Sequence, residues 1–306
     1  MGAVLTGRAS RILAVTAALA LVAASCGEKR TDSSPSAIGG TLATTPGGGA
    51  TDSSGPKGTA PTNSGSPRVT SKPASGSGST STTSDGALRS AASSSPGHLA
   101  GFLLAPGAAD AVVVDVLVQP GVAADSATIA SIRQIVAASS GKSVTVRGPT
   151  ALNASSNVYS DDDIRRLADA QGQAQGNGVA VIHLLYLRGQ FTDDTALGVT
   201  VRADTTAVFP QQIAGVASPF ASRARIERAV VTHELGHVLG LVDIYLDDNR
   251  DDPDHPGHST NPNSVMYWAV ESSLIGQVLD GPPPTEFDGA DQSDLRRIHE
   301  GAPAAR

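Results

Sequence analysis

Two histidines and one glutamate in the second half of the chain have the spacing of a metal site. Residues 230–243 read VVTHELGHVLGLVD, which places His233 and His237 four positions apart with Glu234 between them. On a helix, residues four apart lie on the same face, so both imidazoles can reach one metal ion from a rigid support. Glu234 then lies beside that ion as a candidate general base.

A catalytic zinc ion normally has three protein ligands, and the sequence offers several candidates for the third. Gly240 follows His237 by three residues, so it can adopt a left-handed conformation, end the helix and turn the chain back. That turn would bring the carboxylate of Asp243 toward the metal, and Asp243 is our predicted third ligand. The alternative third ligand is His258, and the weaker candidates are His255 and Glu271.

The extended pattern HExxHxxGxxD, followed by Ser-Val-Met-Tyr at 264–267, resembles the motifs of the metzincin zinc peptidases. The resemblance implies that Met266 packs beneath the zinc site as a floor and that Tyr267 lines the cleft. The segments HPGH at 255–258 and MYW at 266–268 are also similar to a group of bacterial lipoproteins. In that group Asn can stand at the position of Asp243, which keeps His258 open as the alternative ligand.

The metzincin resemblance covers residues 97–303 and implies a fold and an activity. The fold is an α/β (α+β) catalytic domain with a mixed, mostly parallel twisted sheet, a central zinc-binding helix and a loop-rich C-terminal subdomain. The activity is that of a zinc-dependent endopeptidase, with Glu234 taking a proton from the water that attacks the peptide bond. The alternative is a non-catalytic zinc-binding structural or interaction lipoprotein.

The elements that must position these residues follow from apolar periodicity and end signals. Predicted strands are 111–118, 143–147 and 179–187, predicted helices are 125–140, 161–170 and 288–300, and 195–201 and 205–209 are extended. The zinc-binding helix is expected to begin at Ser218-Pro219, because serine caps a helix and proline suits its first turn. By resemblance, 205–209 is the exposed sheet edge that pairs with an extended substrate. His183 is expected to pack in the core.

The first 96 residues have the composition of an export signal and a tether. Residues 1–26 combine Arg8 and Arg11 with an apolar run, and their end, Ala-Ala-Ser-Cys, resembles a bacterial lipobox, which predicts acylation of Cys26. Residues 27–96 are rich in Ser, Thr, Gly and Pro and are predicted to be disordered. We therefore expect a protein anchored by lipid at Cys26 to the extracytoplasmic face of the cell membrane.

Composition limits the remaining partners and cofactors. The 306-residue chain has a net charge of −7, which excludes nucleic acid as its main partner, and its single cysteine allows no intramolecular disulfide. The acidic segment 247–258 offers oxygen ligands, so Ca²⁺ is a second candidate metal beside Zn²⁺. We expect a monomer that acts on a protein or peptide substrate.

Overall fold

The computed structural model describes residues 80–304. The predicted signal segment, Cys26 and most of the predicted tether lie outside the described residues. Within the described part of the chain, no helix combines the length and the apolar character that crossing a membrane requires.

A single five-stranded sheet supports the site. Its strand order is β2-β1-β4-β7-β6, comprising β1 (Ala111–Val118), β2 (Ser143–Ala151), β4 (Val179–Tyr186), β6 (Gly198–Arg202) and β7 (Thr205–Val208). The β2-β1, β1-β4 and β4-β7 pairs are parallel, whereas β6 runs antiparallel to β7. This arrangement confirms the predicted mixed, mostly parallel sheet.

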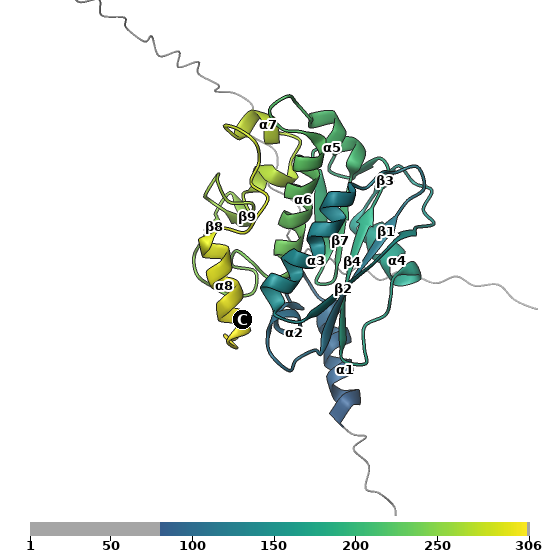
Figure 1. Cartoon of the computed structure of the whole chain (residues 1–306), viewed down its shortest axis with the longest axis vertical. Helices are drawn as coiled ribbons and strands as arrows, with labels where there is room; N and C mark the ends of the chain where they lie inside the picture. The colour runs from purple at the N-terminus through teal and green to yellow at the C-terminus, as the bar shows by residue number, and fades with distance from the viewer. Residues whose placement is uncertain (1–79, 305–306) are drawn as a thin grey trace, which may run out of the picture. The chain divides into compact units, whose positions relative to one another are not determined.

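Helices cover both faces of the sheet, as β-α-β connections require. Helix α4 (Asp161–Gln171) packs on one face over a cluster that includes Leu117, Leu185 and Phe209. The larger cluster lies on the other face, beneath α3 (Ser126–Ser140) and α6 (Arg223–Val238). Figure 1 shows α3 and α6 side by side between the sheet and the C-terminal part. The shorter elements are α2 (Ala100–Leu104), β3 (Val158–Tyr159), β5 (Gln190–Phe191) and α5 (Pro210–Val216).

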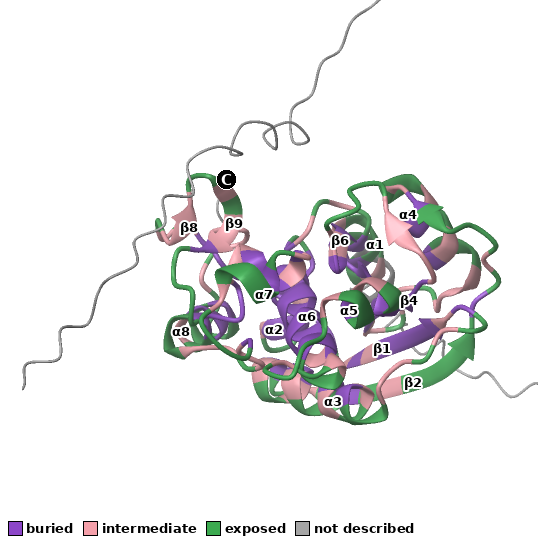
Figure 2. Ribbon diagram, turned by 90° about the horizontal axis from the view of Figure 1, so that it is seen from above, coloured by how far each residue is buried: buried purple, intermediate pink, exposed green. Residues whose placement is uncertain are grey.

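Helix α6 carries the HExxH motif and is buried along almost its whole length (Figure 2). It begins later than predicted, because the side chain of Ser222 caps it by accepting from the backbone N–H of Arg225 at 3.3 Å. Ser218 has the same capping chemistry but accepts instead from the N–H groups of Phe220 and Ala221 in the preceding loop. A sequence with two serines in cap-like positions does not by itself decide which one starts the helix.

The chain beyond α6 is the predicted loop-rich C-terminal part. Its elements are short, apart from the last helix: β8 (Asp251–Asp252), β9 (His255–Ser259), the 3₁₀ helix η1 (Trp268–Glu271), α7 (Ile275–Val278) and α8 (Gly289–His299). Helix α8 opens with a capping box between Asp288 and Asp291, which agrees with the predicted helix 288–300. In Figure 1 this part lies on the side of α6 that faces away from the sheet.

The ordered domain begins before residue 97, so the predicted boundary of the tether was wrong at its C-terminal end. Helix α1 (Thr80–Ala92) lies within the predicted disordered range, yet Leu88 and Ala92 are each only 2% exposed in the main core. Ser and Thr are common in this helix, so its composition resembles that of the tether. The helical signal is limited to apolar residues such as Leu88 and Ala92, which lie one turn apart. Asp85 adds a tertiary contact by accepting from the N–H of Gly178.

The sheet ends in β2 on one side and in β6, beside α6, on the other, so the prediction that made residues 205–209 an edge strand was wrong. Strand β7 lies between β4 and β6, and all four of its residues are buried, as expected for an interior strand. Strand β6 has a strand neighbour on one side, so its other side retains unpaired backbone groups among the described residues.

Candidate metal centre

Four side chains from three separate segments converge beside α6. They are His233 and His237 of α6, His258 of β9 and Glu271 at the end of η1, and their ligand atoms all lie within 4.8 Å of one another. Both α6 histidines are buried, while the Glu271 side chain is 27% exposed. The group therefore has one face toward the core and one toward solvent.

Backbone carbonyls orient two of the imidazole rings. His233 Nδ1 lies 2.7 Å from the carbonyl oxygen of Val265, and His258 Nδ1 lies 3.3 Å from that of His255. A carbonyl can only accept, so the proton must be on Nδ1 in both rings, and Nε2 is left to bind a metal. This second layer of contacts is what a metal-binding histidine normally requires.

The arrangement suits a cation between the imidazoles. His233 Nε2 and His237 Nε2 lie 3.0 Å apart in a buried setting, a distance that suits either a hydrogen bond from the Nε2–H tautomer of His237 or a shared metal ion. Burial lowers the pKa of His237 well below its usual value, and His233 and His258 lower it further, so a proton is disfavoured on that ring. A metal ion would bind both Nε2 atoms without protonating either ring.

The donor set fits zinc. Two nitrogen ligands of one tetrahedral zinc ion lie about 3.3 Å apart, close to the observed spacing of the α6 imidazoles. Imidazole and carboxylate are both ordinary zinc ligands, and Glu271 approaches His258 Nε2 at 3.0 Å and His233 Nε2 at 3.5 Å. Burial alone would raise the pKa of Glu271, but His258 and His233 hold it well below its usual value, so the carboxylate is charged.

Glu234 faces the same region from α6 and is held by the edge strand. Its side chain is fully buried, and Thr200 Oγ1 of β6 donates to Oε2 at 2.7 Å, while Oε1 makes no hydrogen bond among the described residues. Gly198 provides the space, since a Cβ there would lie 2.6 Å from Glu234 Oε1. Burial, and then the nearby charge of Glu271, raise the pKa of Glu234 well above its usual value. Sequence reasoning missed both Thr200 and Gly198, because nothing local marks them.

Met266, the predicted floor of the site, packs directly against α6. It is fully buried, and a Cβ at Gly236, between the two α6 histidines, would overlap the Met266 sulfur. The carbonyl of Met266 also accepts from the N–H of Ser259 at 2.8 Å, which ties the turn to the strand that carries His258.

We expect Gly236→Ala to destabilise the protein because of this contact. Overpacking of a well-packed core costs about 1–3 kcal/mol, which corresponds to a fall in Tm of roughly 2–10 °C for a domain of this size. The matched control is Gly215→Ala in α5, where a Cβ would meet nothing within 4 Å. Thermal unfolding of both variants tests the contact, and equal Tm values would contradict it.

The structure does not bring Asp243 to the metal group and brings the alternative, His258, there instead. Gly240 does turn the chain, with φ of 77°, but Asp243 itself is also left-handed, with φ of 57°. Its carboxylate accepts from the N–H groups of Asp248, Arg250 and Asp251 at 2.8–3.1 Å, so it organises the following loop. These bonds outweigh burial and lower the pKa of Asp243 to about 2.

The remaining predicted site residues lie outside the four-residue group. His255 stacks on Trp268, with ring centroids 4.4 Å apart, and lies 3.1 Å from Asp252. Tyr267 is partly buried against the main core, and its ring centroid is 5.8 Å from that of Trp268. His183 is 4% exposed in the core, as predicted.

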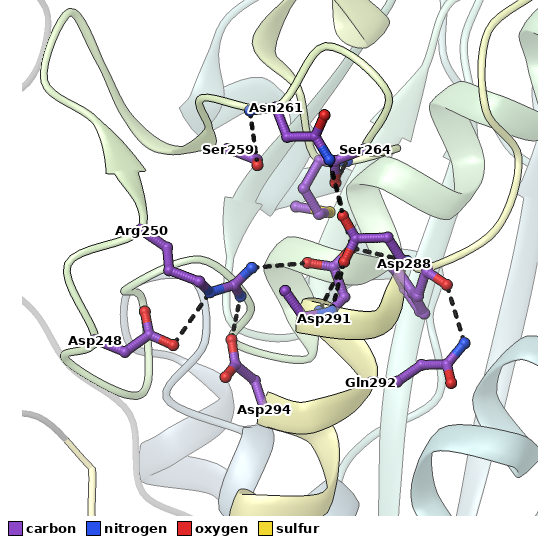
Figure 3. A network of polar contacts seen from close by, with 12 residues as sticks. Asp248, Arg250, Ser259, Asn261, Ser264, Asp288, Asp291, Gln292 and Asp294 are labelled. Atoms are coloured by element: carbon purple, nitrogen blue, oxygen red, sulfur yellow. Dashed lines mark hydrogen bonds and ion pairs between the residues drawn. The ribbon is translucent and has the colours of Figure 1, made fainter.

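Arg250 lies in the acidic segment that offers oxygen ligands for Ca²⁺. Figure 3 shows its guanidinium among three carboxylates, those of Asp248, Asp294 and Asp291. Arg250 thus contacts all three carboxylates, and within the described part of the chain the only cluster suited to a metal is the His/Glu group. The arrangement does not support a calcium site.

The Arg250 network also connects the last helix to the metal centre. Ser264 Oγ donates to Asp291 of α8 at 3.3 Å and accepts from the N–H of Met266 at 3.1 Å. Arg250 precedes the strand that carries His258 and reaches the same Asp291 at 3.5 Å. Helix α8 therefore fixes both the floor of the site and the loop of its third imidazole.

We expect Arg250→Met to lower stability in a pH-dependent way. Removing one partner of a largely buried ion network costs about 3 kcal/mol. Burial, Asp243 and Asp294 raise the pKa of Asp248 to about 7, and burial and Asp288 raise that of Asp291 to about 6. A carboxyl group whose pKa is raised in the folded state stabilises that state at low pH. This contribution is lost as the pH rises through the raised pKa. Without Arg250 this loss grows, so the Tm deficit of the variant should be larger at pH 8 than at pH 5.

The control for this experiment is Arg296→Met, on the exposed side of α8, because Arg296 has no ion pair with any residue of the range 80–304. It should change Tm little at either pH. An Arg250→Met deficit that is the same at pH 5 and pH 8 would contradict the electrostatic role of the network.

Comparison with known proteins gives structural neighbours of low identity. No family model matches the sequence, and no curated protein matches it. The archaemetzincin of Methanopyrus kandleri has 18% identity and a TM-score of 0.42, with 63% of this chain and 97% of that chain covered. The malonate complex of the archaemetzincin of Archaeoglobus fulgidus has 14% identity and a TM-score of 0.37 over 60% and 98%. A zinc-dependent peptidase of Methanocorpusculum labreanum has 16% identity and a TM-score of 0.37 over 60% and 99%. At such low scores, function must rest on the site itself.

Proposed function

We propose that this protein is a zinc-dependent endopeptidase. The observation that supports the proposal most is the convergence of three imidazoles beside a buried glutamate. Two of these imidazoles and the glutamate come from α6. His233, His237 and His258 would hold the ion, with their Nε2 atoms directed inward. When bound, zinc would polarise the scissile carbonyl and make the attacking water more acidic.

Glu234 is the proposed general base. Its burial and the neighbouring Glu271 favour the protonated form, so once ionised it is a stronger base than an exposed carboxylate. It would take a proton from the attacking water and give it to the leaving amine. Thr200 holds one carboxylate oxygen at 2.7 Å and so keeps the other free for this transfer.

The substrate class follows from the sheet edge. Strand β6 carries Thr200, so one of the two edge strands of the sheet also contacts the general base. An extended peptide that adds to this edge would be hydrogen-bonded through its main chain and aligned with the metal centre. Such pairing depends on backbone groups and therefore suits peptide bonds within a longer chain.

Location remains part of the proposal. The lipobox-like sequence before Cys26 and the polar composition of residues 27–79 support a protein that acts outside the cell membrane while held by a lipid anchor. Its substrates would then be extracytoplasmic proteins or peptides.

A cleavage profile tests the activity. The full chain should cut a mixture of unstructured peptides at internal bonds, and mass spectrometry should detect the new termini. Cleavage should stop when a chelator removes the metal and return when zinc is restored. Products that form equally well in chelator would contradict a metal-dependent peptidase.

One observation favours the second candidate, a non-catalytic zinc-binding lipoprotein. Glu271 completes a set of four protein donors, and structural zinc sites are four-coordinate and closed, whereas catalytic sites keep a position for water. The behaviour of Glu271 therefore separates the two functions.

A further inference from the structure

Glu271 differs from the three imidazoles in how it is held. His233 and His237 are fixed on a buried helix, and backbone carbonyls orient the rings of His233 and His258. The carboxylate of Glu271 has ion-pair contacts with His258 at 3.0 Å and His233 at 3.5 Å, and no backbone N–H among the described residues donates to it. It ends the four-residue 3₁₀ helix η1, and its side chain is 27% exposed. It is thus the member of the group that can leave with least disturbance.

The main chain of Glu271 lies at the free edge of the sheet. Leu197 lies directly before β6, and its carbonyl accepts from the N–H of Phe209, which follows β7. The N–H of Leu197 donates to the carbonyl of Glu271 at 2.6 Å. Ser273 N–H donates in turn to the carbonyl of Thr195 at 2.7 Å. The segment after η1 therefore continues the line that a peptide added to β6 would follow, and such a peptide would meet Glu271 as it reaches the metal.

We propose that Glu271 is a displaceable fourth ligand that holds the coordination position needed for hydrolysis until a peptide on β6 takes its place. This inference rests on the proposed peptidase function. A site with four protein donors is closed to water and to stray anions, and it opens when a substrate competes for the position. The expected consequence is a resting protein whose metal is poorly accessible to small ligands.

Cobalt substitution in the full chain tests this role without relying on turnover. Azide, as a small anionic probe, needs a free coordination position, and its binding changes the visible absorption of cobalt. If Glu271 holds the position at least nine-tenths of the time, apparent azide affinity falls about tenfold. Glu271→Ala should therefore bind azide at least about tenfold more tightly than the unaltered chain. Its cobalt spectrum before azide addition should also differ.

Two further variants keep the test decisive. Glu271→Asp retains the charge but shortens the side chain, so it should show an intermediate azide affinity even if Glu271→Ala folds poorly. Glu286→Ala removes an exposed carboxylate, with a side chain 78% exposed, and should match the unaltered chain. Equal azide affinities and identical spectra for the Glu271 variants and the unaltered chain would overturn the proposal. That outcome is separate from failure of the peptidase function, which would appear as absence of cleavage in every variant while azide binding still reports on Glu271.

Discussion

His258→Ala should lose its metal, whereas Asp243→Ala should retain it. Removing His258 leaves two imidazoles and the partly exposed carboxylate of Glu271. Loss of the third imidazole should weaken zinc binding by more than about 100-fold. Competition with a chromophoric chelator measures the affinity of each full-chain variant. The comparison is informative because the spacing from Gly240 favoured Asp243 as the ligand.

Asp243→Ala is the matched variant for this experiment, and its effect should fall on stability. Its carboxylate accepts from three backbone N–H groups in the loop after α6, so its removal should cost about 2–4 kcal/mol. The pKa of Asp243 is lowered to about 2, so this stability exists above its usual value of 3.8 and disappears as pH falls toward 2. Normal zinc binding in His258→Ala together with loss of zinc in Asp243→Ala would refute the assignment of His258.

Glu234→Gln should abolish turnover and leave the metal in place. A general base contributes about 10²–10⁴-fold, so kcat on a peptide substrate should fall by that factor at equal zinc content. Gln can still accept from Thr200, and burial already disfavours the charged form of Glu234, so Tm should not fall. A large loss of Tm would instead assign Glu234 a structural role.

The control for Glu234→Gln is Glu286→Gln, which makes the same chemical change at an exposed position. It should leave kcat unchanged. Equal loss of activity in both variants, or full activity in Glu234→Gln, would contradict the role of Glu234.

Local geometry made half of the metal group predictable from the sequence. His233 and His237 follow from helical spacing alone, and the parallel strands follow from apolar runs such as 179–187. Elements whose end signals are local, such as α3 with Asp125 before it and Gly141 after it, agree with prediction to within a residue or two.

The other half depends on long-range packing. His258 lies in β9 and Glu271 ends η1. The segments beside them are held by the Arg250–Asp291 and Ser264–Asp291 contacts, which join residues 41 and 27 positions apart and which no local pattern encodes. Asp243 is a suitable zinc ligand by its chemistry and its spacing from Gly240, but its carboxylate accepts hydrogen bonds from backbone N–H groups of the following loop. The edge strand was misassigned because β6 and β7 both look extended, and only the tertiary order of the sheet distinguishes them.

A zinc titration of the metal-free full chain tests the proposed function most directly. Hydrolysis of an unstructured peptide should rise linearly with added zinc and reach a plateau at one zinc per chain, as expected for a single group formed by His233, His237 and His258. The Glu234→Gln chain should bind the same amount of zinc and show no comparable rise. If the unaltered chain binds one zinc and cleaves no faster than Glu234→Gln, the zinc site is non-catalytic and the peptidase function is refuted.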